Sequence, residues 1–166
     1  MSPSDDVEPA FWDADGGYGV QQPLTDRAVR EAEHLLDVTL PASLLDLLGA
    51  QNGGQVTAAR NAFRTDRPTS WSKDHVPFDH VMGIGHRERT ISLLDSPYLV
   101  EEWGLPSPVV LLWGDGPCWV ALDYRARGRH GEPSVAWFDA DADVELALAP
   151  DFASFVEGLT SAGDFD

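Results

Sequence analysis

The sequence predicts an α+β fold with a mainly antiparallel sheet, built on a central three-stranded meander near residues 108–138 and flanked by helices. The first observation is a succession of three apolar runs, rich in β-branched and aromatic residues, at 109–113, 118–124 and 134–138. Such runs with polar connections are typical of hairpins. The second is that these runs hold three tryptophans and do not alternate cleanly between apolar and polar residues, which indicates that both sheet faces are at least partly covered. The third is that apolar residues recur at helical spacing on both sides, which supplies the covering helices.

The connections within the meander carry turn residues. Gly114-Asp115-Gly116-Pro117 combines residues that accept positive φ with a proline that fixes φ, so it predicts a tight turn. The polar segment at 125–133 contains two glycines and predicts the second return of the chain. After the meander, residues 144–148 predict a short edge strand.

The sequence also predicts four helices, near residues 26–37, 42–50, 97–103 and 151–160. Thr25 has the side chain of an N-cap, and apolar residues follow it at helical spacing. Pro41 suits the first position of the second helix, because its missing N–H would be unpaired there in any case. Asn52-Gly53-Gly54 supplies the left-handed residues that end this helix.

The last two helices have boundaries of the same kind. Ser96-Pro97 begins the third helix, and Gly104 ends it. Asp151 can cap the fourth helix, whose apolar residues recur at i, i+3, i+4 and i+7 and therefore must pack on the sheet. We expect one hydrophobic core that contains Trp119, Leu122, Val135, Trp137, Phe152 and Phe155.

The region between the second and third helices is the least regular. Residues 55–77 are expected to form a long loop with a short strand at Val56, and loops of this length in compact domains are often functional. Residues 76–84 predict a strand.

The charge of the chain is gathered at its ends. The net charge is −17, with six acids and no base in residues 1–26 and eight acids and no base in 139–166. An acidic surface repels phosphate groups and anionic lipid, so direct binding to nucleic acid or to a membrane is disfavoured and a basic protein partner is favoured. Acidic ends that serve solubility alone are the alternative. We expect an acidic, loosely ordered segment at 1–22 and a single domain at 23–166.

Two features bear on location. Cys118 is the single cysteine, so an internal disulfide is excluded. The N-terminus has no basic or apolar leader pattern, and no run of apolar residues is long enough to span a membrane. The expectation is a cytoplasmic protein whose oligomeric state is open.

Fragments of two metal-site motifs occur, and both fail on spacing. His86-Arg87-Glu88 with Pro117-Cys118 matches part of a zinc deaminase pattern, but the second cysteine is missing because position 121 is alanine. Asp139, Asp141 and Asp143 match the start of an EF-hand loop, which also needs glycine at its sixth and glutamate at its twelfth position. Those positions hold valine and proline. The sequence therefore predicts no metal site and a solvated acidic turn.

No catalytic or cofactor motif was found either. A lone cysteine in an apolar strand such as Cys118 is more often inert core than a nucleophile. There is no GxSxG or GxxxxGK[ST] sequence, and Gly114-Asp115-Gly116 lacks the third glycine and following helix of a dinucleotide site. We therefore expect a protein that is not an enzyme and uses no cofactor.

The order of the segments resembles the SUKH superfamily, which contains bacterial immunity proteins and fungal cell-wall assembly regulators. The resemblance spans about residues 25–160. Its parts are, in order, a short helix, Leu40-Pro41 with a leucine-rich helix ending in Asn52-Gly53-Gly54, Glu102-Trp103-Gly104-Leu105-Pro106, Gly114-Asp115-Gly116, residues 119–125, Gly131-Glu132-Pro133-Ser134-Val135, and a final helix at 152–159. The chain departs from the family pattern at Pro117-Cys118, where members often carry a histidine.

The resemblance implies an α+β fold and a binding role without catalytic residues. Bacterial members of the superfamily typically neutralise polymorphic toxins, often nucleases, by direct contact. The implied function is thus a protein-binding domain that acts as an immunity protein against a nuclease-type toxin, with a regulatory or scaffold domain of the same fold as the alternative. The residues expected to contact a basic toxin partner are Asp139, Asp141, Asp143, Trp12 and Trp71. We further expect these acids to cluster with Asp151, Glu157 and the N-terminal acids.

Overall fold

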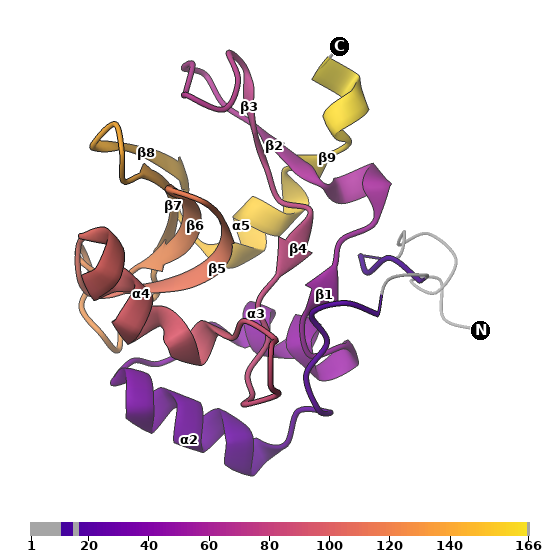
Figure 1. Cartoon of the computed structure of the whole chain (residues 1–166), viewed down its shortest axis with the longest axis vertical. Helices are drawn as coiled ribbons and strands as arrows, with labels where there is room; N and C mark the ends of the chain where they lie inside the picture. The colour runs from indigo at the N-terminus through magenta and orange to yellow at the C-terminus, as the bar shows by residue number, and fades with distance from the viewer. Residues whose placement is uncertain (1–10, 15–16, 166) are drawn as a thin grey trace.

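The computed structural model describes residues 11–14 and 17–165 of the 166-residue chain. Within this range it contains four α-helices, three short 3-10 helices and nine strands in three antiparallel sheets (Figure 1). The predicted α+β fold class is confirmed. Among the described helices, none is both long and apolar enough to cross a membrane.

The largest sheet is a four-stranded meander. Its strands are β5 (Val109–Asp115), β6 (Cys118–Asp123), β7 (Ser134–Asp139) and β8 (Val144–Ala149), in the order β5-β6-β7-β8. Each neighbouring pair is antiparallel. The first three strands form the predicted meander, and the expected edge strand joins it as β8, at the left of Figure 1.

Two helices precede the sheets in the chain. Helix α2 (Asp26–Leu36) begins at Thr25, whose hydroxyl accepts a hydrogen bond from the backbone N–H of Ala28 at 3.1 Å. Helix α3 (Ala42–Ala50) begins after Pro41 as expected. Both helices lie within one residue of their predicted bounds.

Helices α4 (Ser96–Trp103) and α5 (Phe152–Glu157) flank the large sheet. Helix α4 ends at Gly104, which adopts the left-handed φ of 67° that glycine tolerates. Helix α5 is capped by Asp151 but ends at residue 157, so the predicted extension to 160 is wrong. The chain leaves the helix at Gly158 and forms β9 (Leu159–Thr160), which pairs with β2 (Ala62–Arg64).

The region expected to be a long loop contains short strands. In addition to β2, these are β1 (Gly54–Gln55) at its start and β3 (His75–Pro77) at its end, and β4 (His80–Val81) follows within the predicted strand 76–84. Strands β2 and β3 form a hairpin, so the loop prediction is wrong there, and β1 pairs with β4. The predicted strand over 76–84 is broken after Pro77, which has no N–H for a further ladder bond. The 3-10 helices are η1 (Ala58–Arg60), η2 (Leu93–Asp95) and η3 (Ala162–Phe165).

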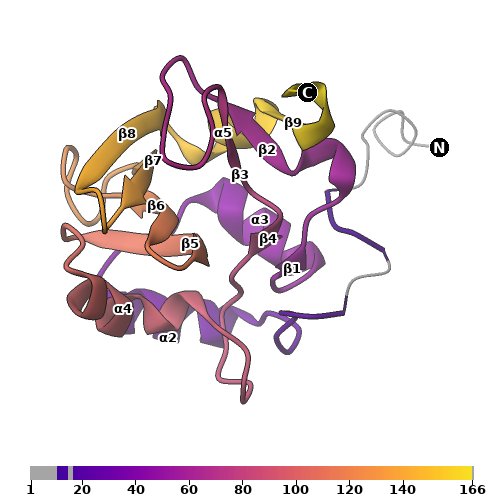
Figure 2. The same cartoon turned by 45° about the horizontal axis from the view of Figure 1, so that its top comes forward.

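The core lies on both faces of the meander. Helix α5 packs on β7 and β8, and α4 packs on β5. Figure 2 shows α2 and α4 side by side along the β5 edge of this sheet. All six residues predicted for the core are buried within one hydrophobic cluster, including Trp137, Phe152 and Phe155 at 0% exposure.

Candidate protein-binding surface

One end of the four-stranded sheet gathers acidic residues from two turns. The β5–β6 turn and the β7–β8 turn lie at the same end because neighbouring strands run in opposite directions. Asp115 of β5 and Asp139 of β7 are both register partners of Cys118 in β6, so the two acids flank one residue. Asp141 and Asp143 follow in the next turn. We call Asp115, Asp139, Asp141 and Asp143 the acidic end of the sheet.

The side chain of Asp139 is buried, so the prediction that all three acids of the β7–β8 turn are solvated is wrong for this residue. Asp139 is 5% exposed. Its carboxylate accepts a hydrogen bond from the Ser70 hydroxyl and bonds of 3.1 Å from the backbone N–H groups of Asp141 and Ala142. The hydrogen bond from Ser70 is the main cause that lowers the pKa of Asp139. Asp139 thus organises the turn.

The other acids of the acidic end point to solvent. Asp115, Asp141 and Asp143 are exposed, as predicted for the latter two. Asp143 adopts a left-handed φ of 54° at the end of the turn. Three carboxylates are therefore available to a partner around the buried fourth one.

Trp71 lies next to the acidic end. Its indole is 42% exposed, and its ring meets the rings of Trp113 and Trp137 edge-on, at centroid distances of 5.6 and 6.3 Å. The hydrogen bond from the preceding residue, Ser70, to Asp139 ties this loop to the end of β7. Trp71, which the sequence analysis expected to contact a partner, is thus the exposed member of a tryptophan cluster.

The polar neighbours of this cluster are fixed as well. Trp113 donates its indole N–H to Asp79 Oδ1 at 2.6 Å, and the His80 ring lies 5.5 Å from the Trp113 ring. The hydrogen bond with His80 is the largest cause that lowers the pKa of Asp79, and the hydrogen bond from Trp113 lowers it further. The buried indole nitrogen of Trp137 has no hydrogen-bond partner among the described residues.

Trp12, the other aromatic predicted to contact a partner, lies elsewhere. It is half-buried, forms an isolated bridge with Val56, and places its indole N–H 3.4 Å from the carbonyl oxygen of Leu47 in α3. Its ring packs edge-on against Phe11 at 4.9 Å. The structure therefore docks Trp12 on the domain and does not bring it into the Trp71 cluster.

The expected cluster of C-terminal acids is divided. Asp151 follows the opposite end of β8 from Asp143, and a six-residue strand spans about 20 Å. Its side chain accepts the N–H of Ser154 at 2.7 Å, and this bond lowers the pKa of Asp151. Glu157 lies further on, at the end of α5. The prediction that Asp151 joins the acidic turn is wrong. The predicted contribution of Asp5, Asp6, Glu8 and Asp15 lies outside the described residues.

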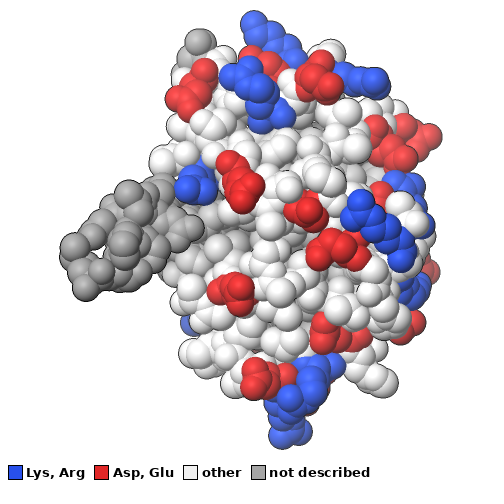
Figure 3. All heavy atoms as spheres, turned by 180° about the vertical axis from the view of Figure 1, so that it is seen from behind, with Lys and Arg blue, Asp and Glu red and all other residues white. Residues whose placement is uncertain are grey.

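The charge distribution elsewhere is mixed. Figure 3 shows the face opposite to Figure 1, where acidic and basic side chains are interspersed rather than separated. A large net charge has therefore not produced a uniformly negative surface on that face.

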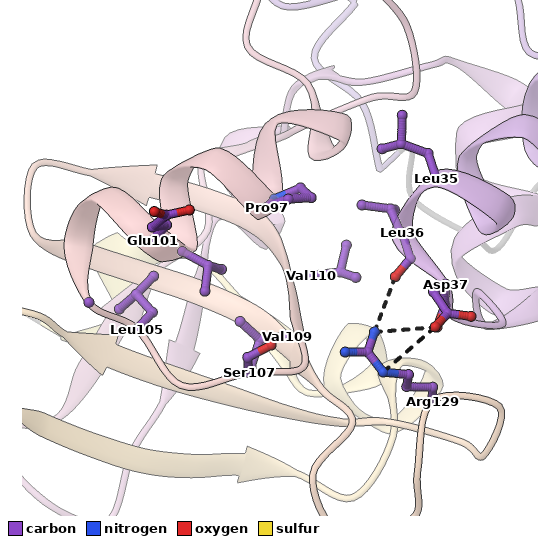
Figure 4. A pocket seen from close by; sticks show the side chains of 12 residues that line it. Leu35, Leu36, Asp37, Pro97, Glu101, Leu105, Ser107, Val109, Val110 and Arg129 are labelled. Atoms are coloured by element: carbon purple, nitrogen blue, oxygen red, sulfur yellow. Dashed lines mark hydrogen bonds and ion pairs between the residues drawn. The ribbon is translucent and has the colours of Figure 1, made fainter.

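A groove that the sequence did not predict lies between α2 and α4. It has a volume of about 620 Å³, with Val109 and Val110 of β5 and the exposed Leu35 among its lining residues (Figure 4). The Arg129 guanidinium approaches the carbonyl oxygens of Leu36 and Asp37 at 3.4 and 3.5 Å, and so it satisfies the end of α2. The sequence does not distinguish the exposed Leu35 from the buried Leu36, because the apolar stripe of a helix commonly includes adjacent residues.

The polar clusters do not have the geometry of a nucleophilic site. Ser72, Asp74 and His75 lie together, but Ser72 Oγ and Asp74 Oδ1 both contact the same nitrogen, His75 Nδ1, at 3.2 and 2.8 Å. In a serine triad the two partners occupy different ring nitrogens.

Burial is the first cause that raises the pKa of Cys118. Within the described part of the chain, no group of three His, Cys, Asp or Glu side chains could hold a metal ion.

Comparison with known protein families identifies the family of this chain. The family model described as SMI1 / KNR4 family (SUKH-1) matches residues 23–158, which is most of the chain. No curated protein and no solved structure matches this chain. The fold, the order of its elements and the extent of this match together show that the chain belongs to the SMI1/KNR4 family, SUKH-1.

Proposed function

We propose that this protein is an immunity-type binding protein that neutralises a basic, nuclease-type toxin domain by direct contact. The contact surface in this proposal is the acidic end of the sheet together with Trp71. The observation that carries it is the placement of exposed carboxylates around Asp139, which is hydrogen-bonded to the loop that presents Trp71. A partly exposed aromatic residue beside charged groups is a usual composition of a protein interface.

The chemistry of nucleases supports an acidic contact surface. A nuclease neutralises the phosphates of its substrate with lysine and arginine side chains. An acidic protein surface is attracted to the same basic region, and this attraction raises the association rate and selects the partner. A protein bound there would also exclude the nucleic acid by occupying the space. The same contact would thus raise the association rate and keep the nucleic acid out of the toxin.

Membership of the family supports either an immunity-type or a regulatory role. A regulatory or scaffold domain without a toxin partner is therefore the alternative. The two roles differ in the activity of the bound partner, because only a toxin domain loses a destructive activity on binding.

The test is a pull-down from the source cells at low salt with three forms of the full chain. The first is the wild type, the second is Asp115→Lys/Asp141→Lys, and the third is the matched control Glu88→Lys/Glu157→Lys, which makes the same charge change at exposed positions elsewhere. Asp143 is kept, because its left-handed φ would add backbone strain to a lysine. We expect the wild type and the control to retain the same basic protein and the Asp115/Asp141 variant to lose it.

The retained protein is then assayed for nuclease activity with and without the wild-type chain. Inhibition of a nuclease supports the proposal, and retention of a protein with no such activity supports the regulatory alternative. Equal retention by all three forms would show that the acidic end is not the contact surface.

A further inference from the structure

We propose that β8 is an open sheet edge that accepts an extended, basic segment of the protein partner as a fifth antiparallel or parallel strand. This inference rests on the proposed function, because it names the backbone contact that the same partner makes beside the acidic end. The present proposal concerns hydrogen bonds to the β8 backbone, whereas the proposed function concerns contacts of the charged side chains at the acidic end.

The backbone of β8 is hydrogen-bonded on one side only. Its register partners, from Asp139↔Val144 to Val135↔Ala149, all belong to β7. Among the described residues, β8 pairs with no other strand, and its backbone makes no hydrogen bond to a loop or turn. A row of unpaired N–H and C=O groups is a template for an additional strand.

The opposite edge of the sheet is already occupied. Met82 donates its backbone N–H to the carbonyl oxygen of Leu112 at 2.8 Å, and Leu111 donates its N–H to Ser96 Oγ at 2.9 Å. Helix α4 also packs on β5. A strand could therefore be added at β8 but not at β5.

The sequence of β8 lacks two of the usual protections of an edge strand, lysine and proline. It contains no lysine and no proline within Val144–Ala149, and Val144 is 44% exposed. Its one charged residue, Glu145, is engaged by Arg125 at 3.0 Å. A register shift at Val135/Ala136 leaves Leu148 without a partner, so the regular part of the edge is 144–147. These four residues span about 13 Å, enough for a short segment of a partner.

There is space beside this edge for the side chains of an added strand. A groove of about 370 Å³ separates residues 146–148 of β8 from residues 63–66, which run from the end of β2 into the following loop. The β2–β3 hairpin therefore does not close on β8. In peptide recognition by strand addition, the edge supplies affinity and such pockets supply selectivity.

The charge around the edge favours a basic segment over a second copy of this chain. Asp141 and Asp143 lie at the start of β8, and Asp66 lines the opposite wall of the groove. The bases near this edge already have partners. Arg64 has its guanidinium over the Phe165 ring at 4.9 Å, Arg125 pairs with Glu145 at 3.0 Å, and Arg127 donates to the carbonyl oxygen of Pro150 at 3.3 Å. Pairing of two copies through β8 would bring two chains of net charge −17 together. A segment rich in lysine or arginine instead complements these acids.

The test uses a synthetic peptide of four Lys-Val repeats and the full chain, with amide hydrogen exchange followed by NMR. We expect alternate amides within 144–147 to exchange about tenfold more slowly when the peptide concentration is ten times its dissociation constant. A peptide of four Glu-Val repeats serves as the charge control and should give no protection. The edge proposal is overturned if millimolar Lys-Val peptide leaves these amides unchanged, and the basic occupant is overturned if the Glu-Val peptide protects them equally.

Two variants at exposed alanines distinguish binding at the β8 edge from a general effect of added positive charge. Ala147→Lys places a like charge beside the docked basic strand and should weaken binding of the Lys-Val peptide about two- to fivefold. Ala153→Lys adds the same charge on α5 and should leave the affinity unchanged. Equal effects of both variants, or protection that appears with rising protein concentration and no peptide, would overturn the proposal. If the Asp115/Asp141 variant retains the cellular partner while β8 protection is observed, the acidic contact surface is overturned and the edge proposal stands. If that variant loses the partner while the Lys-Val peptide gives no β8 protection, the edge proposal is overturned and the acidic contact surface stands.

Discussion

The hydroxyl of Ser70 donates a hydrogen bond to the buried carboxylate of Asp139, and this contact joins the β2–β3 loop to the end of β7. Residue 70 belongs to the segment that carries Trp71, and residue 139 begins the acidic turn. The same bond therefore fixes the position of the exposed indole and the course of the exposed acids. The two halves of the candidate surface depend on one another.

Replacement of Ser70 by alanine is expected to destabilise the fold by about 1.5–3 kcal/mol at neutral pH, the usual contribution of a hydrogen bond to a charged group. Because the folded-state pKa of Asp139 is lowered from 3.8, the stabilisation is complete above about pH 3.8 and is lost as the pH falls through the folded-state pKa. Urea denaturation of Ser70→Ala and wild type should thus differ at pH 7 and converge in strong acid. Ser43→Ala in α3 is the matched control, and a constant difference at all pH values would contradict the assignment.

Phe155→Ala is expected to cost about 3–5 kcal/mol of stability. Phe155 is fully buried, stacks on Phe63 at 4.7 Å and meets Phe78 edge-on at 4.9 Å, so its loss leaves a cavity lined by these two rings. Chemical denaturation measures the change. Val156→Ala, at a half-buried position of the same helix, should cost less, and a loss below about 1 kcal/mol for Phe155→Ala would contradict this packing.

Trp71→Ala should weaken binding of the protein retained in the pull-down by about 2 kcal/mol, close to thirtyfold, as expected of an aromatic anchor at an interface. Isothermal titration calorimetry with the purified pair gives the dissociation constants. Tyr98→Ala on α4 is the control, because Tyr98 is 67% exposed and lies outside the proposed surface. If both variants bind as the wild type does, Trp71 is not an anchor.

Asn52→Ala should destabilise the domain by about 3 kcal/mol, because two buried hydrogen bonds and one partly buried hydrogen bond are lost. Its side-chain amide donates to the carbonyl oxygens of Gln22 and Ile84 at 2.7 and 2.8 Å, and its Oδ1 accepts the N–H of Ile84 at 2.8 Å. Thermal unfolding at neutral pH checks the value. A change smaller than that of Gln51→Ala, whose side chain makes one bond to the neighbouring Gly53 backbone, would contradict this role.

Asn52 also illustrates what the sequence could and could not predict. The sequence correctly predicted that a helix ends just before the Asn52-Gly53-Gly54 segment, but α3 ends at Ala50 with Gln51 already extended, and the positive φ angles of Gly53 and Gly54 come after the helix end. The role of Asn52 in joining residue 22 to residue 84 depends on chain segments 30 and 32 positions away. The close approach of Gly53 to Gly83 has the same origin, since a Cβ at Gly53 would lie 2.7 Å from the Gly83 nitrogen.

The same distinction holds for the strands and for the candidate surface. The meander was predictable because its apolar runs are long and are separated by turn residues. The strands β2 and β3 were not, because each has three residues and the ten residues between them are mostly polar. Asp141 and Asp143 were correctly predicted to be solvated. Asp139 was not, because its burial depends on Ser70, which lies 69 positions away.

The tryptophan cluster gives this protein an intrinsic optical reporter. Trp113 and Trp137 are stacked at 5.9 Å with an interplanar angle of 26°, and Trp71 lies edge-on to both. Indole transitions this close couple to each other, so the cluster should produce an exciton pair in the circular dichroism spectrum whose sign and intensity depend on ring geometry. A displacement of Trp71 by a docked molecule would alter that signal without any added label. Contact at the acidic end can therefore be followed in the unmodified chain.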